Sequence, residues 1–484
     1  MTTAVPSPGG PGPGAAAGAA VLAQELGAFA AAFTLDDVPE ADALVERVRW
    51  HVLDSAGLAL SSWTAEDGFA DKLLAAQREV IGAGACTVAG RAESLPAPAA
   101  AFLNGSLIHG SDYDDVHALT VMHCEGFATA AMLAVAERDD LSGRELVEAW
   151  IVATEVAIRL ASAPHDVGGL FPNGFHNTAV FGTLGVAAGV SRLLGLGAEQ
   201  AANAMALAVS FASGTSVGWL QASGRNKPPQ AGWAARSGIA AAELAATGYA
   251  CSLRTIDGPR GLLDAHTMGH GWSPEPIVEG LGSEWRTLQT AIKLYPCGMM
   301  CQATAECADV LVSEHGIRPE EVLSGRLTIP EQFWPVVEDM GPALHRPPSG
   351  FAMIGAYPCI VARTIVSGRY GLEHQVEAAA RDPRMLEVAD RIAVLRDDDS
   401  GHLPVDERPT TLELETTRGT FAHAVGRDGG QPGRLGRDRV VAKFRDNASQ
   451  LVGEEQAGRI EEAALAVDRL GSARELAGLL RVGR

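Results

Sequence analysis

One short segment, residues 104–125, concentrates side chains that could transfer protons. It reads NGSLIHGSDYDDVHALTVMHCE and contains three aspartates and three histidines, namely Asp112, Asp114, Asp115, His109, His117 and His123. Histidine titrates near neutral pH, and a nearby carboxylate can orient its ring or shift its pKa. The segment therefore predicts acid–base chemistry. Two alternatives stay open: a metal site, although HExxH or another standard ligand spacing is lacking, and a solvated acidic loop, since unpaired buried carboxylates are costly.

A further histidine, His176, stands at the start of an expected helix. The segment GLFPNGFHNTAVFGTLG, residues 168–185, places it after a loop and before an apolar run, with Asn177 or Thr178 as the expected N-cap. The dipole at that end of a helix disfavours imidazolium, so we expect a neutral ring. His176 is therefore interpreted either as a proton-transfer residue or as a structural loop histidine.

Basic residues gather around a Pro-Pro turn in residues 223–238, SGRNKPPQAGWAARSG. Arg225, Lys227 and Arg236 lie here. Cations beside the amides of a helix start make an anion site. The alternative is a solvated basic loop, but this loop contrasts with a chain whose net charge is −21.

The composition narrows the class of protein. The chain has 484 residues, is 47% hydrophobic and 20% charged, and so is typical of a soluble globular protein with two or three domains. Its net charge of −21 argues against nucleic acid and anionic membranes as partners. The cysteines form no CxxC pair, so we expect neither a disulfide framework nor structural zinc, and a cytoplasmic location. The apolar stretches are too short to span a membrane, and residues 1–19 are expected to be a disordered tail.

The residue patterns predict a mainly α protein with a large all-helical domain and a smaller α+β lid domain. The pattern is helical through residues 20–288, where Ser142 and Glu145 form an expected capping box before a buried helix over 146–163. Further helices, rich in Ala and Gly and therefore able to approach closely, are expected over 178–195, 198–212 and 232–248.

Strand-like patterns mark the α+β domain, residues 289–425. We expect strands at 326–330, 391–395 and 410–425, the last turning near Arg418–Gly419, and helices at 300–316 and 351–368. A Gly-rich linker, 426–438, leads to the C-terminal region 439–484. Its amphipathic helix, expected over 454–482, should return to the helical domain and complete it.

The start of the second domain invites another interpretation. The segment KLYPCGMMCQATAECADVL, residues 293–311, contains Cys297, Cys301 and Cys307, which could suggest a metal site or a nucleophile. Their spacing within an expected helix favours core packing instead. Tyr357, in GFAMIGAYPCIVA, is by default expected in a helix core.

Taken in order, these segments resemble the MmgE/PrpD family from about residue 20 to 480. The matching stretches are NGSLIHGSDYDDVH, GFHNTAVFGTLGVAAGVSRLLGL, KPPQAGWAARSG, DGPRGLL (257–263), KLYPCG and GLEH (371–374). The family includes 2-methylcitrate dehydratase, cis-aconitate decarboxylase and an iminodisuccinate epimerase. The resemblance implies a large helical domain closed by the C-terminal helix, a smaller α+β lid, a homodimer, and no metal, iron–sulfur cluster or organic cofactor.

The resemblance also implies site residues. It carries over Asp112, His123, His176, Lys227 and Tyr357. His123 and His176 would transfer protons, and Asp112 would orient or tune a histidine. Lys227 would bind a carboxylate, and Tyr357 would donate a hydrogen bond from the lid. The remaining substrate-binding candidates are Arg225, His117, Gly298 and Gln302.

Some positions depart from the family pattern. The family usually has His-Pro where this chain has His123 followed by Cys124, and often Thr at the position of Val116. Its decarboxylase-like members have histidines where this chain has Gly298, Gln302 and Gln230. The proton-transfer core is therefore similar to that of the family, whereas the parts that bind the substrate differ.

Together these observations predict a cofactor-independent lyase of the dehydratase type. It would act on a small di- or tricarboxylic acid by acid–base catalysis alpha to a carboxylate. The same residues could decarboxylate a cis-aconitate-like acid or epimerise a dicarboxylate, because all three reactions share an intermediate stabilised next to a carboxylate. The non-enzyme alternative is a catalytically degenerate family member that binds a ligand.

Overall fold

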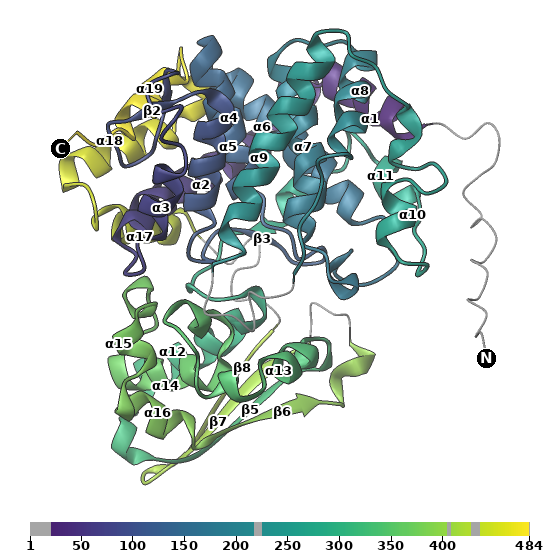
Figure 1. Cartoon of the computed structure of the whole chain (residues 1–484). Coiled ribbons are helices and arrows are strands. Elements are labelled where there is room, and N and C mark those ends of the chain that lie inside the picture. Colours follow the sequence, from purple (N-terminus) through teal and green to yellow (C-terminus); the bar gives the residue numbers. More distant parts are fainter. Residues whose placement is uncertain (1–20, 217–224, 404–407, 427–435, 484) are drawn as a thin grey trace, which may run out of the picture.

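The computed structural model describes residues 21–216, 225–403, 408–426 and 436–483 (Figure 1). The expected N-terminal tail and most of the expected linker lie outside these residues. The described chain is mainly helical and has a small mixed sheet in its C-terminal half, as the sequence predicts. No described helix is both long and apolar enough to cross a membrane.

Helices form the first and larger core. Its elements are α1 (Leu22–Ala32), α2 (Ala41–Ser61), α3 (Phe69–Ala75), α4 (Ala97–Ile108), α5 (Glu125–Asp139), α6 (Gly143–Ala161), α7 (Asn177–Leu193), α8 (Ala198–Ala208), α9 (Pro228–Ala246), α10 (Leu262–His266), α11 (Glu275–Val278) and the short pair β1 (Cys86–Thr87) and β2 (Ser94–Leu95). The expected capping box of Ser142 and Glu145 starts α6. α7 packs between α6 and α9, and α9 packs in turn on α4. This layering places the ends of α4, α7 and α9 near the same edge of the core (Figure 1).

Glycines let these helices approach more closely than larger residues would. A methyl group added at Gly232 of α9 would lie 2.0 Å from the carbonyl oxygen of Phe102 in α4. One added at Gly185 of α7 would lie 2.3 Å from the carbonyl oxygen of Ala153 in α6. Both distances are far below van der Waals contact, so these positions require glycine. The expected close packing of the Ala- and Gly-rich helices is confirmed.

A second hydrophobic core forms around the mixed sheet. The strands are β5 (Val322–Pro330), β6 (Ile392–Asp397), β7 (Thr410–Thr416) and β8 (Gly419–Val425), in the order β6-β5-β7-β8. β5 pairs parallel to β6 and antiparallel to β7, and β7 and β8 form the expected hairpin. The helices of this core are α12 (Gln302–His315), α13 (Trp334–Met340), α14 (Tyr357–Ser367), α15 (Glu377–Ala380) and α16 (Pro383–Ala389). We propose that the two hydrophobic cores define the two domains, with a boundary near residue 294.

The C-terminal region packs against the first core but is not one long helix. It consists of α17 (Arg437–Ala448), α18 (Glu454–Ala464) and α19 (Arg474–Leu479), so the expectation of a single helix over 454–482 is wrong. The chain between α18 and α19 also hydrogen-bonds to the residues at the start of α6: Gly143 N donates to Leu470 O, and Ala473 N donates to Leu141 O. α17 and α18 pack on α2, far from them in sequence (Figure 1).

The close helix contacts predict that a Gly→Ala substitution has opposite effects on the free energy of unfolding at two positions. Gly232→Ala should destabilise the fold by about 1–3 kcal/mol, because overpacking forces α4 and α9 apart. Gly458→Ala in α18, where an added methyl group meets no atom within 4 Å, should stabilise it by about 0.5–1 kcal/mol through the helix preference of alanine. Urea unfolding monitored by circular dichroism measures both changes. Equal effects of the two substitutions would contradict the close packing.

Candidate active site

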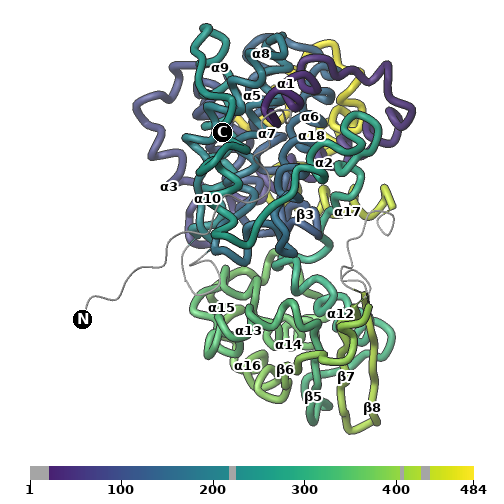
Figure 2. The backbone as a smooth tube through the Cα atoms, turned by 90° about the vertical axis from the view of Figure 1, so that its right-hand side faces the viewer, coloured from purple at the N-terminus to yellow at the C-terminus, as the bar shows by residue number. Residues whose placement is uncertain are grey.

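The loop between α4 and α5 brings its acidic residues and histidines to the boundary of the two cores. Here the short strand β3 (Val116–His117) pairs with β4 (Thr290–Ala291), just before the second core begins. β3 lies where the two parts of the molecule meet in both views (Figures 1 and 2). Asp112, Asp114 and Asp115 are all fully buried, so the alternative of a solvated acidic loop does not hold.

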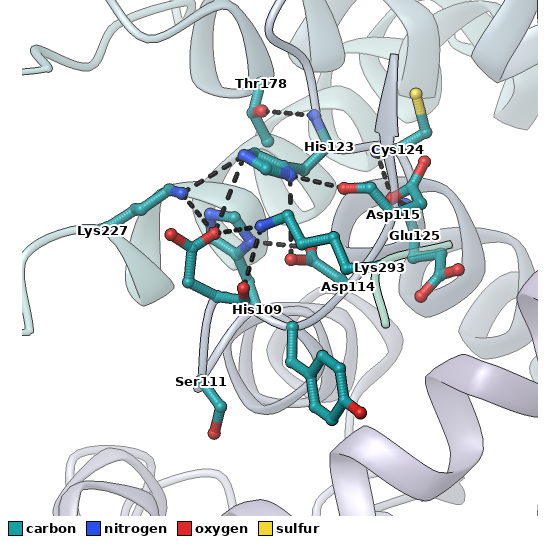
Figure 3. A network of polar contacts seen from close by, with 12 residues as sticks. His109, Ser111, Asp114, Asp115, His123, Cys124, Glu125, Thr178, Lys227 and Lys293 are labelled. Carbon is teal, nitrogen blue, oxygen red and sulfur yellow. Dashed lines mark hydrogen bonds and ion pairs between the residues drawn. The ribbon is translucent and has the colours of Figure 1, made fainter. Parts of the chain in front are cut away.

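Asp112 is the centre of a buried ionic network with two lysines. Figure 3 shows these lysines, Lys227 and Lys293, close to His123. Its Oδ1 accepts hydrogen bonds from Lys227 Nζ at 2.6 Å and from Lys293 Nζ at 2.5 Å. Lys293 Nζ also donates to the Asp112 carbonyl oxygen at 2.8 Å. The backbone of Asp112 has a φ of +51°, a left-handed conformation that costs free energy for a residue other than glycine. This conformation lets one lysine contact both the carboxylate and the carbonyl of the same residue.

The charges of this network shift the pKa of each member. Burial alone would raise the pKa of Asp112, but the two ammonium groups outweigh it and hold that pKa well below its usual range. Burial lowers the pKa of Lys227. The charges of Asp112 and Asp114 outweigh burial at Lys293 and raise its pKa. Asp112 is therefore ionised, and two lysines share one carboxylate.

His123 follows the loop and is held in one tautomer. Its Nδ1 lies 2.5 Å from the carbonyl oxygen of Asp115, an atom that can only accept, so Nδ1 carries the hydrogen. Its Nε2 lies 3.2 Å from Lys227 Nζ, which donates to it. Burial, followed by the charge of Lys227, lowers the pKa of His123 well below its usual value. His123 is thus a neutral imidazole with a lone pair on Nε2.

His176 precedes the first residue of α7 and is held in the same tautomer. Its Nδ1 lies 2.7 Å from Gln230 Oε1, and the amide of Gln230 is oriented by donating through Nε2 to Thr215 O. Burial and the charge of Lys227 lower the pKa of His176 well below its usual value. Its Nε2 is buried without a hydrogen-bond partner among the described residues. The expected neutral ring is therefore found, although the dominant cause is burial.

The expected N-caps of α7 have other partners. The N-cap position belongs to His176, and its side chain makes no capping bond. Thr178 Oγ1 instead accepts from the backbone N–H of His123 at 2.9 Å. Asn177 accepts from Leu170 N and donates to the carbonyl oxygens of Gly168 and Thr120. The expectation of an Asn or Thr cap is wrong, because both side chains tie neighbouring loops to the site.

His109, at the end of α4, completes the group of histidines. Its Nδ1 lies 2.7 Å from Asp114 Oδ2, and its Nε2 is buried without a partner among the described residues. The His109 ring centroid is 5.0 Å from that of His123 and 5.7 Å from that of His176. Three imidazoles and two lysines therefore surround the Asp112 carboxylate.

A second group of buried acids lies behind this network. Asp115 Oδ1 accepts from the backbone N–H groups of Cys124 and Glu125 at the start of α5. Burial and the charge of Asp114 raise the pKa of Asp115 to about 8. Glu125 lies 2.6 Å from His51 Nδ1, and burial raises its pKa well above the usual value. The structure thus ionises Asp112 but favours the neutral form of its neighbour Asp115.

Arg225 and His117, two predicted site residues, form hydrogen bonds outside the network around Asp112. Arg225 pairs with Asp67, donates to Gly110 O and lies over the rings of Phe69 and Phe351 at 4.3 and 4.5 Å. His117, in β3, contacts Thr120 Oγ1 at 2.8 Å and Gln289 Oε1 at 3.3 Å. Arg225 therefore anchors its loop through these contacts, and its role as a substrate-binding residue stays a prediction, as does that of His117.

Two predicted site residues of the second domain, Gln302 and Gly298, hydrogen-bond to nearby backbone. Gln302 uses its whole amide on the preceding loop, accepting from the N–H groups of Leu294 and Tyr295 and donating to the carbonyls of Tyr295 and Cys297. It therefore holds the segment that follows Lys293, and its predicted contact with substrate stays untested. Gly298 N donates to Ile354 O, which fixes the same segment.

Tyr357, at the start of α14, is fully buried, and its hydroxyl has no hydrogen-bond partner among the described residues. Burial, followed by the nearby thiol of Cys301, raises the pKa of Tyr357 well above its usual value. A protonated hydroxyl without a partner can donate to a ligand, so the predicted role remains open. The three expected core cysteines, Cys297, Cys301 and Cys307, are buried free thiols.

The sequence did not single out Lys293 as a site residue. Lys293 is 181 positions from Asp112 and has no other candidate site residue beside it in the sequence. Its place at the start of KLYPCG was the one signal that could have suggested a role. His109 and Asp114 belong to segment 104–125, which is rich in acids and histidines, but their spacing did not show that they pair. Topology, rather than spacing, brings these residues together.

Among the residues that the structure describes, two groups of side chains have donor atoms close enough to hold a metal ion. They are His109, Asp114 and His123, and His51, Asp115 and Glu125, with donor atoms within 4.8 Å of one another in each group. The ammonium groups of Lys227 and Lys293 lie beside the first group through Asp112 and oppose a bound cation. The same positive charges favour an anion.

Comparison with known families gives a match for each half of the chain. The chain matches the MmgE/PrpD N-terminal domain over residues 24–275 and the MmgE/PrpD C-terminal domain over residues 295–469. The chain belongs to the MmgE/PrpD family.

Similar proteins include several named decarboxylases. The cis-aconitate decarboxylase-like protein oryM of Aspergillus oryzae is 28% identical over 82% of this chain and 85% of its own length. The cis-aconitate decarboxylase of Aspergillus terreus is 30% identical over 60% of each chain. The cis-aconitate decarboxylase of Homo sapiens is 30% identical over 58% of this chain and 59% of its own length. The matched region thus spans about three fifths of the latter two proteins.

The raised pKa of Asp115 predicts how stability depends on pH. Between the usual aspartate value near 3.8 and about 8, the folded state binds more protons at this carboxyl than the unfolded state. Its contribution to stability is therefore lost as the pH rises through about 8. Between pH 6 and pH 9 the melting temperature of the wild type should therefore fall. That of Asp115→Asn, which keeps the acceptor oxygen, should fall less. Differential scanning calorimetry measures this, with the exposed Asp339→Asn as the control. Identical pH dependence of wild type and Asp115→Asn would contradict it.

Proposed function

We propose that this protein is a lyase that acts on a small di- or tricarboxylic acid by proton transfer at a carbon next to a carboxylate. The observation that carries this proposal is the buried network in which Lys227 and Lys293 share Asp112 beside the neutral His123. Two ammonium groups beside His123 suit an anionic substrate, because each can donate a charge-assisted hydrogen bond to a carboxylate. Neutral imidazoles nearby supply groups that can take up a proton.

Decarboxylation of a cis-aconitate-like acid is the first reaction to test. The similar proteins named above carry that activity in their names, and one of them aligns with most of this chain. Loss of carbon dioxide leaves an electron pair on carbon, conjugated with a carboxylate. Lys227 and Lys293 would stabilise the negative charge that develops there. Gly298, Gln302 and Gln230 stand where decarboxylase-like members have histidines, so the substrate itself can differ.

Dehydration is the second candidate and has its own support in the site. It requires a base that removes a proton alpha to a carboxylate. His176 is a neutral imidazole whose Nε2 has no hydrogen-bond partner among the described residues, and His123 can serve once Lys227 turns from its Nε2 to a substrate carboxylate. An acid must then protonate the leaving hydroxyl. The homodimer, the cytoplasmic location and turnover without a metal or cofactor remain predictions.

A panel of carboxylic acids tests the proposal and separates the two reactions. The purified protein is incubated with cis-aconitate, 2-methylcitrate, citrate and related acids, with and without EDTA, and the products are analysed by mass spectrometry. Loss of 44 mass units shows decarboxylation, and loss of 18 shows dehydration. In either case His123→Gln and His176→Gln should each lower kcat by about 10²-fold or more. Absence of turnover of every acid, or unchanged kcat in both variants, would overturn the proposal.

The site also predicts how Lys227 recognises its substrate. Lys227→Met keeps much of the side-chain volume but removes the charge, and loss of one partner of a buried charge pair costs about 2–5 kcal/mol. The value of kcat/KM for the acid should therefore fall by about 30-fold or more, and that for a neutral amide analogue should fall less. Steady-state kinetics on both compounds measures the difference.

Lys443→Met provides the matched control for this measurement. Lys443 is also buried, but it donates to Asp54 Oδ2 at 2.7 Å and to Tyr113 O at 2.6 Å, behind the site. Its loss should affect stability and leave the preference for acid over amide unchanged. Equal losses for both compounds in Lys227→Met would mean that this residue acts only through the fold.

A further inference from the structure

Each of the three clustered imidazoles donates its Nδ1 hydrogen to a different kind of acceptor. His123 donates to the carbonyl oxygen of Asp115, and His176 donates to the amide oxygen of Gln230. His109 donates to a carboxylate oxygen of Asp114. None of these acceptor atoms carries a hydrogen of its own, so every ring holds its Nδ1 hydrogen. The rings differ in how strongly the acceptor at Nδ1 supports a second proton on Nε2.

The acceptor decides which ring can hold a second proton. An ionised carboxylate stabilises an imidazolium by charge, whereas a carbonyl or an amide oxygen supplies only a dipole. Lys227 donates to Nε2 of His123, which requires a lone pair there and keeps that ring neutral. The remaining charged and titratable groups around His109 are His176, Asp112, Lys227 and Lys293. Asp112 is already engaged by both lysines. Asp114 hydrogen-bonds to His109 Nδ1 at 2.7 Å through Oδ2, whereas its Oδ1 lies 3.8 Å from His123 Nδ1, beyond hydrogen-bond distance.

The Nε2 atom of His109 is placed where it could pass such a proton to a ligand. Its Nε2 is fully buried and has no hydrogen-bond partner among the described residues. A buried N–H without an acceptor costs free energy, and such groups persist where a ligand supplies the missing partner. The ring lies within 5.0 to 5.7 Å, centroid to centroid, of both histidines predicted to act in proton transfer. A ligand that reaches Nε2 of His109 therefore lies close to both of these rings.

We propose that His109, supported by Asp114, is the proton donor of the active site, with His123 as the neutral base. This inference rests on the proposed lyase function. In decarboxylation the bond between the substrate carbon and its carboxylate breaks, carbon dioxide leaves, and the electron pair left on carbon takes the proton from Nε2 of His109. In dehydration Lys227 turns from Nε2 of His123 to the substrate carboxylate, His123 removes the alpha proton, and His109 gives its proton to the hydroxyl that leaves as water. His123 then releases the alpha proton to solvent, solvent water returns a proton to His109, and Asp114 acts as a positioning residue.

Kinetics of two variants test the donor role. His109→Gln should lower kcat by about 10²-fold or more and change KM by only a few-fold, because the lost group acts in the chemical step. Asp114→Asn keeps the acceptor but removes its charge. It should move the alkaline limb of the pH–rate profile to lower pH, because the donor loses its proton more readily without the carboxylate. Wild-type kcat in His109→Gln, or an unmoved alkaline limb in Asp114→Asn, would overturn the assignment.

His51 offers a matched control. It is also a buried histidine whose Nδ1 contacts a carboxylate, Glu125, but its Nε2 is already engaged with Thr290 Oγ1 at 2.8 Å. His51→Gln should reduce stability and leave kcat and the pH profile unchanged. A loss in His51→Gln equal to that in His109→Gln would show that any buried histidine has this effect and would overturn the specific role of His109.

Nitrogen NMR of histidine-labelled protein tests the same assignment without any substrate. At neutral pH the wild type should show an imidazolium signal that disappears in His109→Gln and becomes a neutral-ring signal in Asp114→Asn. The signals of His123 and His176 should be those of neutral rings with hydrogen on Nδ1. A neutral His109 in the wild type would overturn the inference even if the lyase reaction is found. If no acid is turned over but the imidazolium signal is present, the reaction class is wrong and the protonation pattern holds.

Discussion

The structure around the site depends on one buried carboxylate held between two ammonium groups. Asp112 reaches Lys227 at the start of α9 and Lys293 just before the second core, so one side chain joins three distant parts of the chain. Burying an ion is costly unless its partners are in place, and removal of one partner leaves the others uncompensated. The strained backbone of Asp112 is tolerated because it directs the carbonyl oxygen, as well as the carboxylate, to Lys293. The geometry of both cores at their boundary therefore follows from satisfying this carboxylate.

The site gathers positive charge in a molecule that is negative as a whole. The chain carries a net charge of −21, yet the ammonium groups of Lys227 and Lys293 lie together at the Asp112 carboxylate. Asp115 contributes little negative charge, because burial raises its pKa to about 8. Of the three histidines clustered at Asp112, His123 and His176 donate from Nδ1 to neutral oxygens, and His109 donates to the carboxylate of Asp114. In the proposed mechanism this difference in acceptor gives chemically identical side chains different roles.

Sequence reasoning located most of this site because its acids and histidines are close together in the chain. It identified the helical core, the hairpin of β7 and β8 and the capping box of α6, since these depend on local patterns. It expected one C-terminal helix, because periodicity alone does not reveal that residues between α18 and α19 hydrogen-bond to the start of α6. Lys293 gave no local signal, because its partner is 181 residues away. Pairings such as that of Gln302 with the loop before it depend on the three-dimensional course of the backbone, which spacing does not specify.

The return of the C-terminal region to the first core has a consequence for synthesis on the ribosome. The buried residues of the second core all lie before residue 426, whereas α17 and α18 complete the first core at the end of the chain. The part of the protein in the middle of the sequence can therefore finish folding while translation continues. The N-terminal helices, although made first, must wait with part of α2 uncovered until the last residues emerge. During that interval the exposed face of α2 is the surface that a chaperone would need to protect.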